Sequence, residues 1–425
     1  MSVSEYRPRV IDKLVDEYLT IFGAVCIEGP KWCGKTRTSN EHSKSSIFLG
    51  DPRGNFQNRN LAVISPELVL QGEYPRLIDE WQEVPALWDA VRYFVDTHQQ
   101  KGLFVLTGSS TPNRKGILHS GAGRIARLRM RPMSLWESGD SSGNVSLRKL
   151  FTGENDSVMT GDVSLIHIIN LIVRGGWPGS IGISPESAGL LAKEYINAVI
   201  NDDASRIDGI KRDKQKLELL LRSLARNEST TASNLTLKKD MQATEGFDID
   251  KETIAMYLDV FNRLFLIDNQ RPFAPSLRSS VRIKQQEKRH FCDPSLAVAI
   301  LNATPSMLIN DLETLGFLFE SLCVRDLRIY AESFNAQLYH YQDYKNREVD
   351  AVISFEDGSW GAFEIKLGAN QIESAAKNLL ALRNDLMKEN PKLAPSLLCV
   401  ICGLSNAAYL RPDGVFVVPI TALKP

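Results

Sequence analysis

The sequence predicts an α/β fold with a doubly wound parallel sheet at the amino-terminal end, a helical middle and a second α/β domain. The first observation is a series of apolar runs at residues 24–27, 77–78 and 102–106, with a helical pattern at 85–98 between two of them. Strands that alternate with helices are typical of a parallel sheet. The second observation is the return of strand-like alternation after residue 350.

Length and composition describe an ordinary globular protein of several domains. The 425 residues are too many for one hydrophobic core, so we expect about two to four domains. The composition is 43% hydrophobic and 24% charged, which is usual for a soluble chain. The net charge of −1 and the pI of about 6.6 give no overall attraction to nucleic acid. Any contact with DNA would therefore need local basic patches.

No targeting or membrane-spanning pattern is visible. The amino-terminal stretch MSVSEYRPRVIDKLVDEY is charged early, and no apolar run approaches the length of a bilayer span. Six scattered cysteines suit a reducing compartment, so we expect a cytoplasmic protein without membrane contact. Cys399 and Cys402 have metal-ligand spacing, but no second Cys/His pair is nearby in the sequence. A buried strand is the favoured interpretation of that run.

The strongest motif is GPKWCGKT at residues 29–36, which matches G-x-x-x-x-G-K-[ST]. It follows the apolar run 24–27 and precedes a polar stretch from Arg37 that can begin a helix. In such a loop, backbone N–H groups and a helix N-terminus surround phosphates. Lys35 would reach the β/γ-phosphates and the Thr36 hydroxyl would bind Mg²⁺. The expected nucleotide-binding residues are Gly29, Pro30, Lys31, Trp32, Cys33, Gly34, Lys35, Thr36 and Arg37.

Two acids follow the second apolar run. Asp79 at a strand end beside the loop would hold Mg²⁺ through water, and Glu80 would orient the attacking water. The third run ends in Thr107-Gly108-Ser109-Ser110. The Ser109 hydroxyl would sense the γ-phosphate, unless this segment is a simple turn.

Six segments together carry a family resemblance. They are GPKWCGKT (29–36), LIDE (77–80), LTGSS (106–110), Gly123-Arg124, RPMSLWE (131–137) and RGGWP (174–178). In this order they resemble the predicted prokaryotic ATPases of the AAA+ superfamily, over essentially the whole chain. The resemblance implies a P-loop AAA+ parallel sheet that binds ATP and Mg²⁺.

The same resemblance implies the organisation of the first half of the chain. Residues 1–140 would be the ATPase core, and 141–205 a linker followed by a helical lid. The Gly-, Ser- and Asp-rich stretch 138–162 reads as the linker or a long loop. Arg124 would be the arginine finger or its neighbour, and Arg174 a lid sensor. Relatives often assemble so that one subunit completes the next subunit's site, but a monomer is left open here.

The region 206–305 resembles a winged helix. Helical patterns at 214–226, 232–241 and 249–265 precede a strand-like 266–268, and Asp250 is the expected N-cap of the third helix. That helix is acidic, which argues against base reading in the major groove. The following wing is basic and would either contact DNA phosphates or form a solvated or interdomain face. Its cations are Arg278, Arg282, Lys284, Lys288 and Arg289.

The last motif is a β-hairpin from Asp350 to Glu364, with an Asp357-Gly358 turn. A two-residue loop would put Asp350 and Glu364 on opposite faces. A three-residue loop with Gly358 in the left-handed conformation would pair them directly, on one face with Lys366. Such groups can hold Mg²⁺ and polarise a phosphodiester.

This hairpin resembles the PD-(D/E)XK nuclease superfamily. Glu320, in a helix expected at 311–330, matches an acidic helical position of those enzymes. Residues 306–425 would then form an α/β nuclease-like domain. One hypothesis is an enzyme in which ATP binding reorients a metal-dependent nuclease on DNA. The alternative is a nucleotide-dependent switch whose C-terminal domain binds a partner without cleaving nucleic acid.

Overall fold

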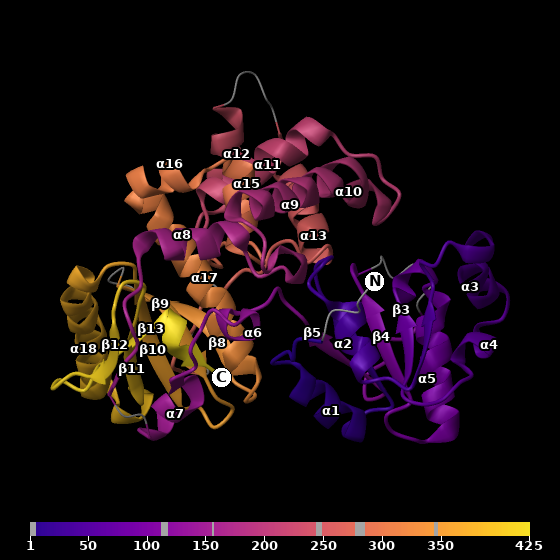
Figure 1. The fold of residues 1–425 in the computed structure, drawn as a ribbon, viewed down its shortest axis with the longest axis horizontal. Helices are drawn as coiled ribbons and strands as arrows, with labels where there is room; N and C mark the ends of the chain where they lie inside the picture. The colour runs from indigo at the N-terminus through magenta and orange to yellow at the C-terminus, as the bar shows by residue number, and fades with distance from the viewer. Residues whose placement is uncertain (1–5, 112–117, 155–156, 244–248, 277–284, 344–346) are drawn as a thin grey trace.

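The computed structural model describes residues 6–111, 118–154, 157–243, 249–276, 285–343 and 347–425. The predicted α/β fold is confirmed: a parallel sheet lies at the amino-terminal end, helices follow, and a second sheet lies at the carboxyl-terminal end (Figure 1). The first sheet has the order β2-β3-β4-β1-β5 and all its pairs are parallel. Its strands are β1 (Ala24–Glu28), β2 (Ser45–Phe48), β3 (Arg76–Asp79), β4 (Phe104–Gly108) and β5 (Ile125–Arg129).

Helices cover both faces of this sheet, as a doubly wound fold requires. Alternate residues of β1 enter different hydrophobic cores: Val25 and Ile27 enter one, and Ala24 and Cys26 the other. The helices are α1 (Asp12–Ile21), α2 (Lys35–Glu41), α3 (Arg53–Ile64), α4 (Pro66–Leu70) and α5 (Ala86–His98). The carboxyl ends of β1, β3 and β4 therefore meet at one edge, where ligands of such sheets bind.

The middle of the chain is helical, as predicted, and lies above both sheets in Figure 1. Asp250 caps α13 as expected, because its carboxylate accepts a hydrogen bond from the Thr253 N–H at 2.5 Å. After α13, the bridges Ile267–Phe291 and Gln270–Lys288 form a short antiparallel ladder. The elements are α8 (Leu165–Arg174), α9 (Pro185–Ala198), a π-helical turn (Val199–Asp203), α10 (Ala204–Arg206), α11 (Lys214–Arg226), α12 (Asn234–Gln242), α13 (Lys251–Arg263), α15 (Pro294–Leu301) and α16 (Pro305–Asn310).

The C-terminal part packs a seven-stranded mixed sheet between α17 (Leu312–Glu332) and α18 (Ile372–Glu389). Cys399 and Cys402 lie buried as free thiols in β11, so the predicted buried strand is confirmed. The strand order is β7 (Val158–Met159), β12 (Ala407–Leu410), β13 (Phe416–Pro419), β11 (Leu397–Cys402), β10 (Trp360–Lys366), β9 (Glu348–Ser354) and β8 (Gln337–Gln342).

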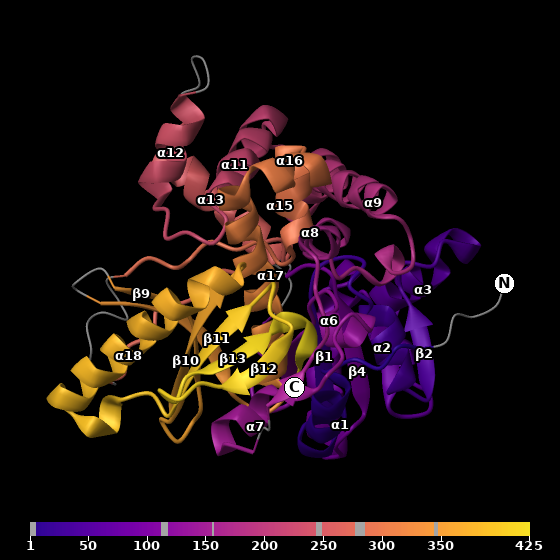
Figure 2. The same ribbon diagram turned by 60° about the vertical axis from the view of Figure 1, so that its left-hand side comes forward.

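The stretch 138–162, predicted to be a linker or a long loop, contains short strands that pair with the C-terminal part of the chain. β6 (Val145–Ser146) pairs with β14 (Leu423–Lys424), and β7 pairs with β12. Between them, α7 (Leu147–Thr152) lies against the C-terminal sheet in both Figure 1 and Figure 2. Glycine and serine predict a flexible segment from local composition alone. β6 and β7 instead pair with strands that lie far away in the sequence. The chain thus contributes a strand, β7, to the C-terminal sheet before it continues into the helical region.

Helix α17 joins the parts of the molecule through buried charges. The Arg325 guanidinium donates to Asp293 Oδ2 at 2.8 Å and to Asp326 Oδ1 at 2.7 Å. The same carboxylates accept from backbone N–H groups of the other regions, Leu135 to Asp326 and Gly176 to Asp293, each at 2.9 Å. The three side chains are almost fully buried.

Among the described helices, none is long and apolar enough to cross a membrane.

Gly176 is needed where the RGGWP segment passes the RPMSLWE segment. A Cβ at this position would lie 2.1 Å from the carbonyl oxygen of Met133. The Met133 N–H also donates to the Gly176 carbonyl at 2.6 Å, so the two backbones are in direct contact. This part of the family-like pattern therefore has a packing role.

We expect Gly176→Ala to destabilise the protein by about 1–3 kcal/mol, because backbone must move to accept the methyl group. Gly179→Ala is the matched control, since a Cβ there meets nothing within 4 Å. Thermal unfolding followed by circular dichroism compares the two variants. Equal melting temperatures for both would contradict the packing role.

Candidate functional site

The phosphate-loop motif forms a tight turn between β1 and α2. Gly34 has φ of +103°, which a side chain would strain, and it directly precedes the first residue of α2. A Cβ on Gly29 would lie 2.1 Å from the Met130 carbonyl oxygen. The Lys35 side chain is buried, and its ammonium donates to the Pro30 carbonyl at 2.8 Å. The Lys35 side chain thus lies against the phosphate loop, where it would supply a positive charge for the phosphates.

Thr36 and Asp79 meet at the carboxyl edge of the sheet. The hydroxyls of Thr36 and Thr107 both donate to Asp79 Oδ1, at 2.8 and 2.7 Å. Burial raises the pKa of Asp79, and these two hydrogen bonds oppose the rise. A hydroxyl beside a carboxylate is the hard oxygen set that Mg²⁺ prefers, so the residues fit this ion. Thr36 would bind it directly and Asp79 through water.

Glu80 and Ser109, which directly follow β3 and β4, also come together. The Ser109 hydroxyl donates to Glu80 Oε2 at 2.7 Å, and the Gln82 amide donates to the same oxygen. Glu80 itself has a left-handed backbone with φ of +57°. Its N–H donates to the Thr107 hydroxyl at 2.9 Å, which fixes the residue relative to Asp79. The side chains predicted to handle water and γ-phosphate therefore touch.

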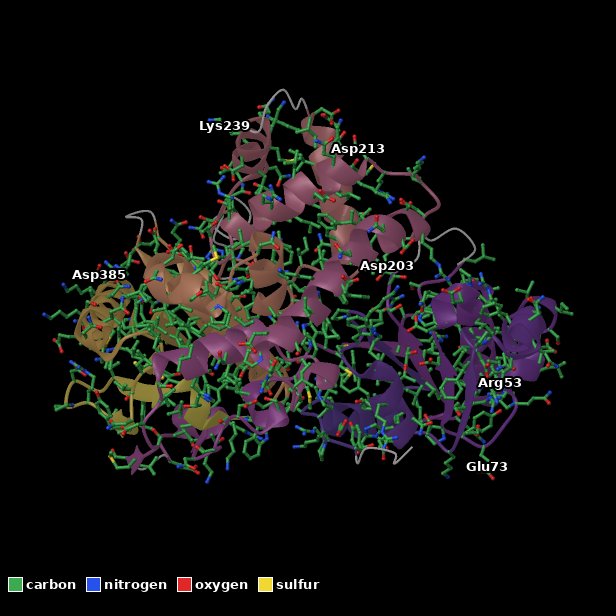
Figure 3. All side chains as sticks on the ribbon, turned by 45° about the horizontal axis from the view of Figure 1, so that its top comes forward. Arg53, Glu73, Asp203, Asp213, Lys239 and Asp385 are labelled. Atoms are coloured by element: carbon green, nitrogen blue, oxygen red, sulfur yellow. The ribbon has the colours of Figure 1, made fainter. Side chains whose placement is uncertain are left out.

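Thr36, Glu80, Gln82 and Ser109 line one cavity of about 890 Å³ between the sheet edge and the helical region, and Asp79 adjoins it through its hydrogen bond with Thr36. Lys31 of the loop pairs with Asp203 at 2.5 Å across this cavity. Figure 3 labels Asp203 where the helices meet the amino-terminal domain. Of the predicted binding residues, Lys31, Trp32, Gly34, Lys35, Thr36, Arg37, Glu80 and Ser109 line the cavity.

Two cavity arginines carry no signal in the sequence. Arg59 in α3 and Arg206 in α10 both pair with Glu83, at 3.1 and 3.2 Å. Both also line the cavity, to which they add positive charge. Their sequence neighbourhoods match no motif, because only the packing of α3 and α10 brings them to the loop.

Arg124 lies away from this cavity. It precedes β5, whose first residue pairs with the first residue of β1, so it stands at the amino end of the sheet. The side chain is 50% exposed and pairs with Asp96 at 2.7 Å. Arg124 is not among the described residues that line the cavity. A role as arginine finger in another copy of the chain stays a prediction. Arg174 likewise pairs with Asp140, at 2.6 Å.

The C-terminal hairpin adopts the three-residue loop. Trp360 pairs with Ser354 and Phe363 with Ala351, a register that sets Asp350 opposite Glu364. Gly358 has φ of +85°, as that loop requires. This choice between the two alternatives puts both carboxylates on one face of the sheet.

Lys366 connects the paired carboxylates. Its ammonium lies 2.9 Å from Asp350 Oδ2 and 2.6 Å from Glu364 Oε2. Burial, followed by the charge of Asp350, raises the pKa of Glu364 to about 7. Burial would also raise the pKa of Asp350, but Lys366 and Lys288 together lower it. The predicted residues Asp350, Glu364 and Lys366 therefore converge.

Glu320 joins this group through Lys288, which was predicted to lie in the basic wing. The Lys288 ammonium lies 2.6 Å from Glu320 Oε1 and 2.8 Å from Glu348 Oε1. It also lies 3.8 Å from Asp350 Oδ1, and its side chain is only 2% exposed. We call Glu320, Glu348, Asp350 and Glu364 the carboxylate cluster. Burial raises the pKa of Glu320 to about 8.

Of the two alternatives for the basic wing, the structure shows an interdomain face for Lys288 and Arg289 and not a surface for DNA phosphates. Arg289 is 8% exposed and donates to Ala232 O and Asn234 Oδ1, at 3.0 and 2.8 Å. The Lys288 backbone pairs with Gln270 and its ammonium contacts Glu320 of α17, so both cations lie at contacts inside the protein. Arg278, Arg282 and Lys284 lie outside the described residues.

The carboxylate cluster does not fit Mg²⁺ as it is arranged. Two ammonium groups already contact its oxygens, and the side-chain amide of Asn378 donates to Glu364. Within the described parts of the chain, no group of three or more His, Cys, Asp or Glu residues is placed to hold a metal ion. No metal-dependent step follows from this geometry.

Three regions match known protein families. Residues 22–138 match the family described as "AAA domain". Residues 166–307 and 315–423 match two domains of unknown function, DUF8612 and DUF4143.

Two curated proteins and two solved structures are similar over longer stretches. The uncharacterized proteins Mb2031c of Mycobacterium bovis and Rv2008c of Mycobacterium tuberculosis are each 22% identical over 349 residues, 80% of this chain and 70% of theirs. The Walker-type ATPase PABY2304 of Pyrococcus abyssi is 14% identical, with 70% of this chain and 99% of that chain covered and a TM-score of 0.43. The Aeropyrum pernix Orc1 protein, solved with DNA, is 13% identical, with 73% and 97% covered and a TM-score of 0.23. By the family matches, residues 22–138 form an AAA-type ATPase-like domain, and the regions after it match families of unknown function.

Proposed function

We propose that the chain binds ATP with Mg²⁺ and hydrolyses it. The observation that carries the proposal is that Thr36, Glu80 and Ser109 line one cavity beside the phosphate loop, with Thr36 hydrogen-bonded to Asp79 and Ser109 to Glu80. Lys35 and the loop amides bind the phosphates, and Glu80 orients the attacking water. A bound Mg²⁺ would supply neutralisation of the charge that develops on the phosphate oxygens.

We further propose that nucleotide binding changes the position of the C-terminal domain. Arg9 supports this coupling, because its guanidinium donates to the loop carbonyl of Cys33 at 2.8 Å and to Glu137 Oε1 at 2.9 Å. Glu137 closes the cap of the short helix α6 (Leu135–Ser138), whose first N–H donates to Asp326 of α17. A shift of the phosphate loop thus reaches the helix that carries Glu320.

For the C-terminal domain we favour the second hypothesis from the sequence. In this hypothesis the protein is a nucleotide-dependent switch, and its C-terminal domain binds a partner without cleaving nucleic acid. The contacts of Lys288 and Lys366 with the oxygens of the carboxylate cluster support it. The second candidate is a metal-dependent nuclease acting on DNA. The convergence of Asp350, Glu364 and Lys366 favours that candidate. The winged-helix assignment and the domain boundaries at 140, 205 and 305 remain part of the proposal.

Lys35→Ala is expected to abolish nucleotide binding, because the phosphates lose their cation. Lys101→Ala, at an exposed lysine, is the control and should bind ATP like the wild type. Glu80→Gln should keep ATP binding and lose about 10²-fold or more in turnover. Isothermal titration calorimetry and phosphate release measure the two effects. Tight ATP binding by the Lys35 variant would overturn the assignment of the loop.

Arg206→Ala should slow ATP hydrolysis by about 10²-fold with a smaller effect on ATP affinity, because a cation facing the γ-phosphate acts mostly in the transition state. Arg226→Ala is the matched control. Arg226 in α11 is about as exposed as Arg206, and it pairs with Asp240 of the next helix, α12. Steady-state kinetics separate kcat from KM. A rate equal to that of the control would exclude Arg206 from the site.

Plasmid nicking with Mg²⁺ or Mn²⁺ separates the two candidates for the C-terminal domain. We expect wild type and Asp350→Ala to show equal and negligible cutting, with and without ATP. Cutting by the wild type that disappears in Asp350→Ala would establish the nuclease instead. The same preparations should hydrolyse ATP, which shows that the protein is folded and active.

A further inference from the structure

Lys288 is a buried cation held by acids from two different elements. Its ammonium contacts Glu320 of α17 and both Glu348 and Asp350 of β9, and its side chain is 2% exposed. An ammonium group has three donors, so one lysine can satisfy three carboxylate oxygens. A lysine this deeply buried keeps its charge only when acids surround it.

The lysine comes from outside the sheet that it closes. Its backbone pairs with Gln270, through N–H to carbonyl bonds of 2.9 Å in both directions. The Gln270 amide in turn donates to the Asp350 carbonyl at 2.9 Å and to the Tyr339 carbonyl at 2.7 Å. The neighbouring Arg289 exchanges backbone hydrogen bonds with Thr230 and Ser229, at 2.7 and 2.8 Å. The strand at 288–291 is therefore anchored in the helical region and delivers its lysine to the C-terminal hairpin.

The position of the ammonium explains why the cluster does not fit a metal ion. Carboxylates gathered from a helix and a hairpin repel one another unless a cation lies between them. A divalent cation would need the Glu320 and Asp350 oxygens that face Lys288. Lysine and metal therefore compete for the same place, and like charges exclude simultaneous occupancy.

We propose that Lys288 is a built-in cation that closes the carboxylate cluster to divalent metal and ties the helical region to the C-terminal domain. The cluster accepts metal only when the strand at 288–291 moves away. This inference is independent of ATP hydrolysis, since it concerns the nucleotide-free chain. It also gives the partner-binding candidate a physical basis, because a closed cluster does no metal chemistry.

The test is a Mn²⁺ titration of the full nucleotide-free chain, with free Mn²⁺ measured by electron paramagnetic resonance. The wild type should show no Mn²⁺ binding that depends on Asp350. Lys288→Met keeps the length of the side chain and removes its charge, and should gain about one Mn²⁺ per chain, with at least ~10-fold tighter binding than the wild type. The gain should disappear in Lys288→Met/Asp350→Asn.

Two further variants control for charge and for folding. Lys288→Arg keeps a cation in the cluster and should not gain the site, and Lys377→Met, at an exposed lysine of α18, should behave like the wild type. Mn²⁺ should raise the melting temperature of Lys288→Met alone. An Asp350-dependent Mn²⁺ site in the wild type overturns the proposal, as does a folded Lys288→Met that gains none. If Lys288→Met does not fold, the wild-type titration with Asp350→Asn decides alone.

Discussion

The buried ion group of Arg325 with Asp293 and Asp326 determines how the parts of this protein meet. Its members are almost fully buried, and each aspartate also accepts a backbone N–H from another region of the chain. Loss of one partner would leave a buried charge uncompensated, at a cost of about 3–5 kcal/mol. The group therefore specifies one docking of α17 against the ATPase domain and the helical region.

A second group of charges surrounds Asp268. Arg129, Arg131 and Arg328 all pair with this carboxylate, at 3.2, 2.5 and 2.7 Å. The charges of these arginines hold the pKa of Asp268 well below its usual range despite its burial. Arginines near the ATPase sheet thus serve domain contacts, and a basic sequence pattern here does not indicate a nucleic-acid surface. The same is true of Lys288 and Arg289 in the wing.

The two candidate sites differ in what their surroundings permit. At the phosphate loop, hydroxyls and carboxylates line an open cavity with cations at its rim, which suits a nucleotide and its Mg²⁺. At the C-terminal hairpin, similar carboxylates converge, but two lysines occupy their oxygens. Helix α17 touches both systems, through Asp326 near the ATPase domain and Glu320 in the carboxylate cluster. The coupling that we propose between nucleotide binding and the C-terminal domain would act through this helix.

Local chemistry in the sequence was sufficient for strands β1, β3 and β4, for helix α5 and for the tight turn of the phosphate loop, and it placed Asp79, Glu80 and Ser109 at one sheet edge. Glycines, caps and apolar periodicity act over a few residues, and parallel strands bring their ends to one edge. The sequence predicted the hairpin but not its register, because an Asp-Gly turn allows a two-residue or a three-residue loop. The pairing of Trp360 with Ser354 selects the three-residue loop. Only the tertiary structure decided the pairing of β6 and β7 with the C-terminal strands, the approach of Arg59 and Arg206 to the phosphate loop, and the burial of Lys288. These features depend on strand edges and charges that lie far apart in the chain, and no local pattern encodes which of them meet.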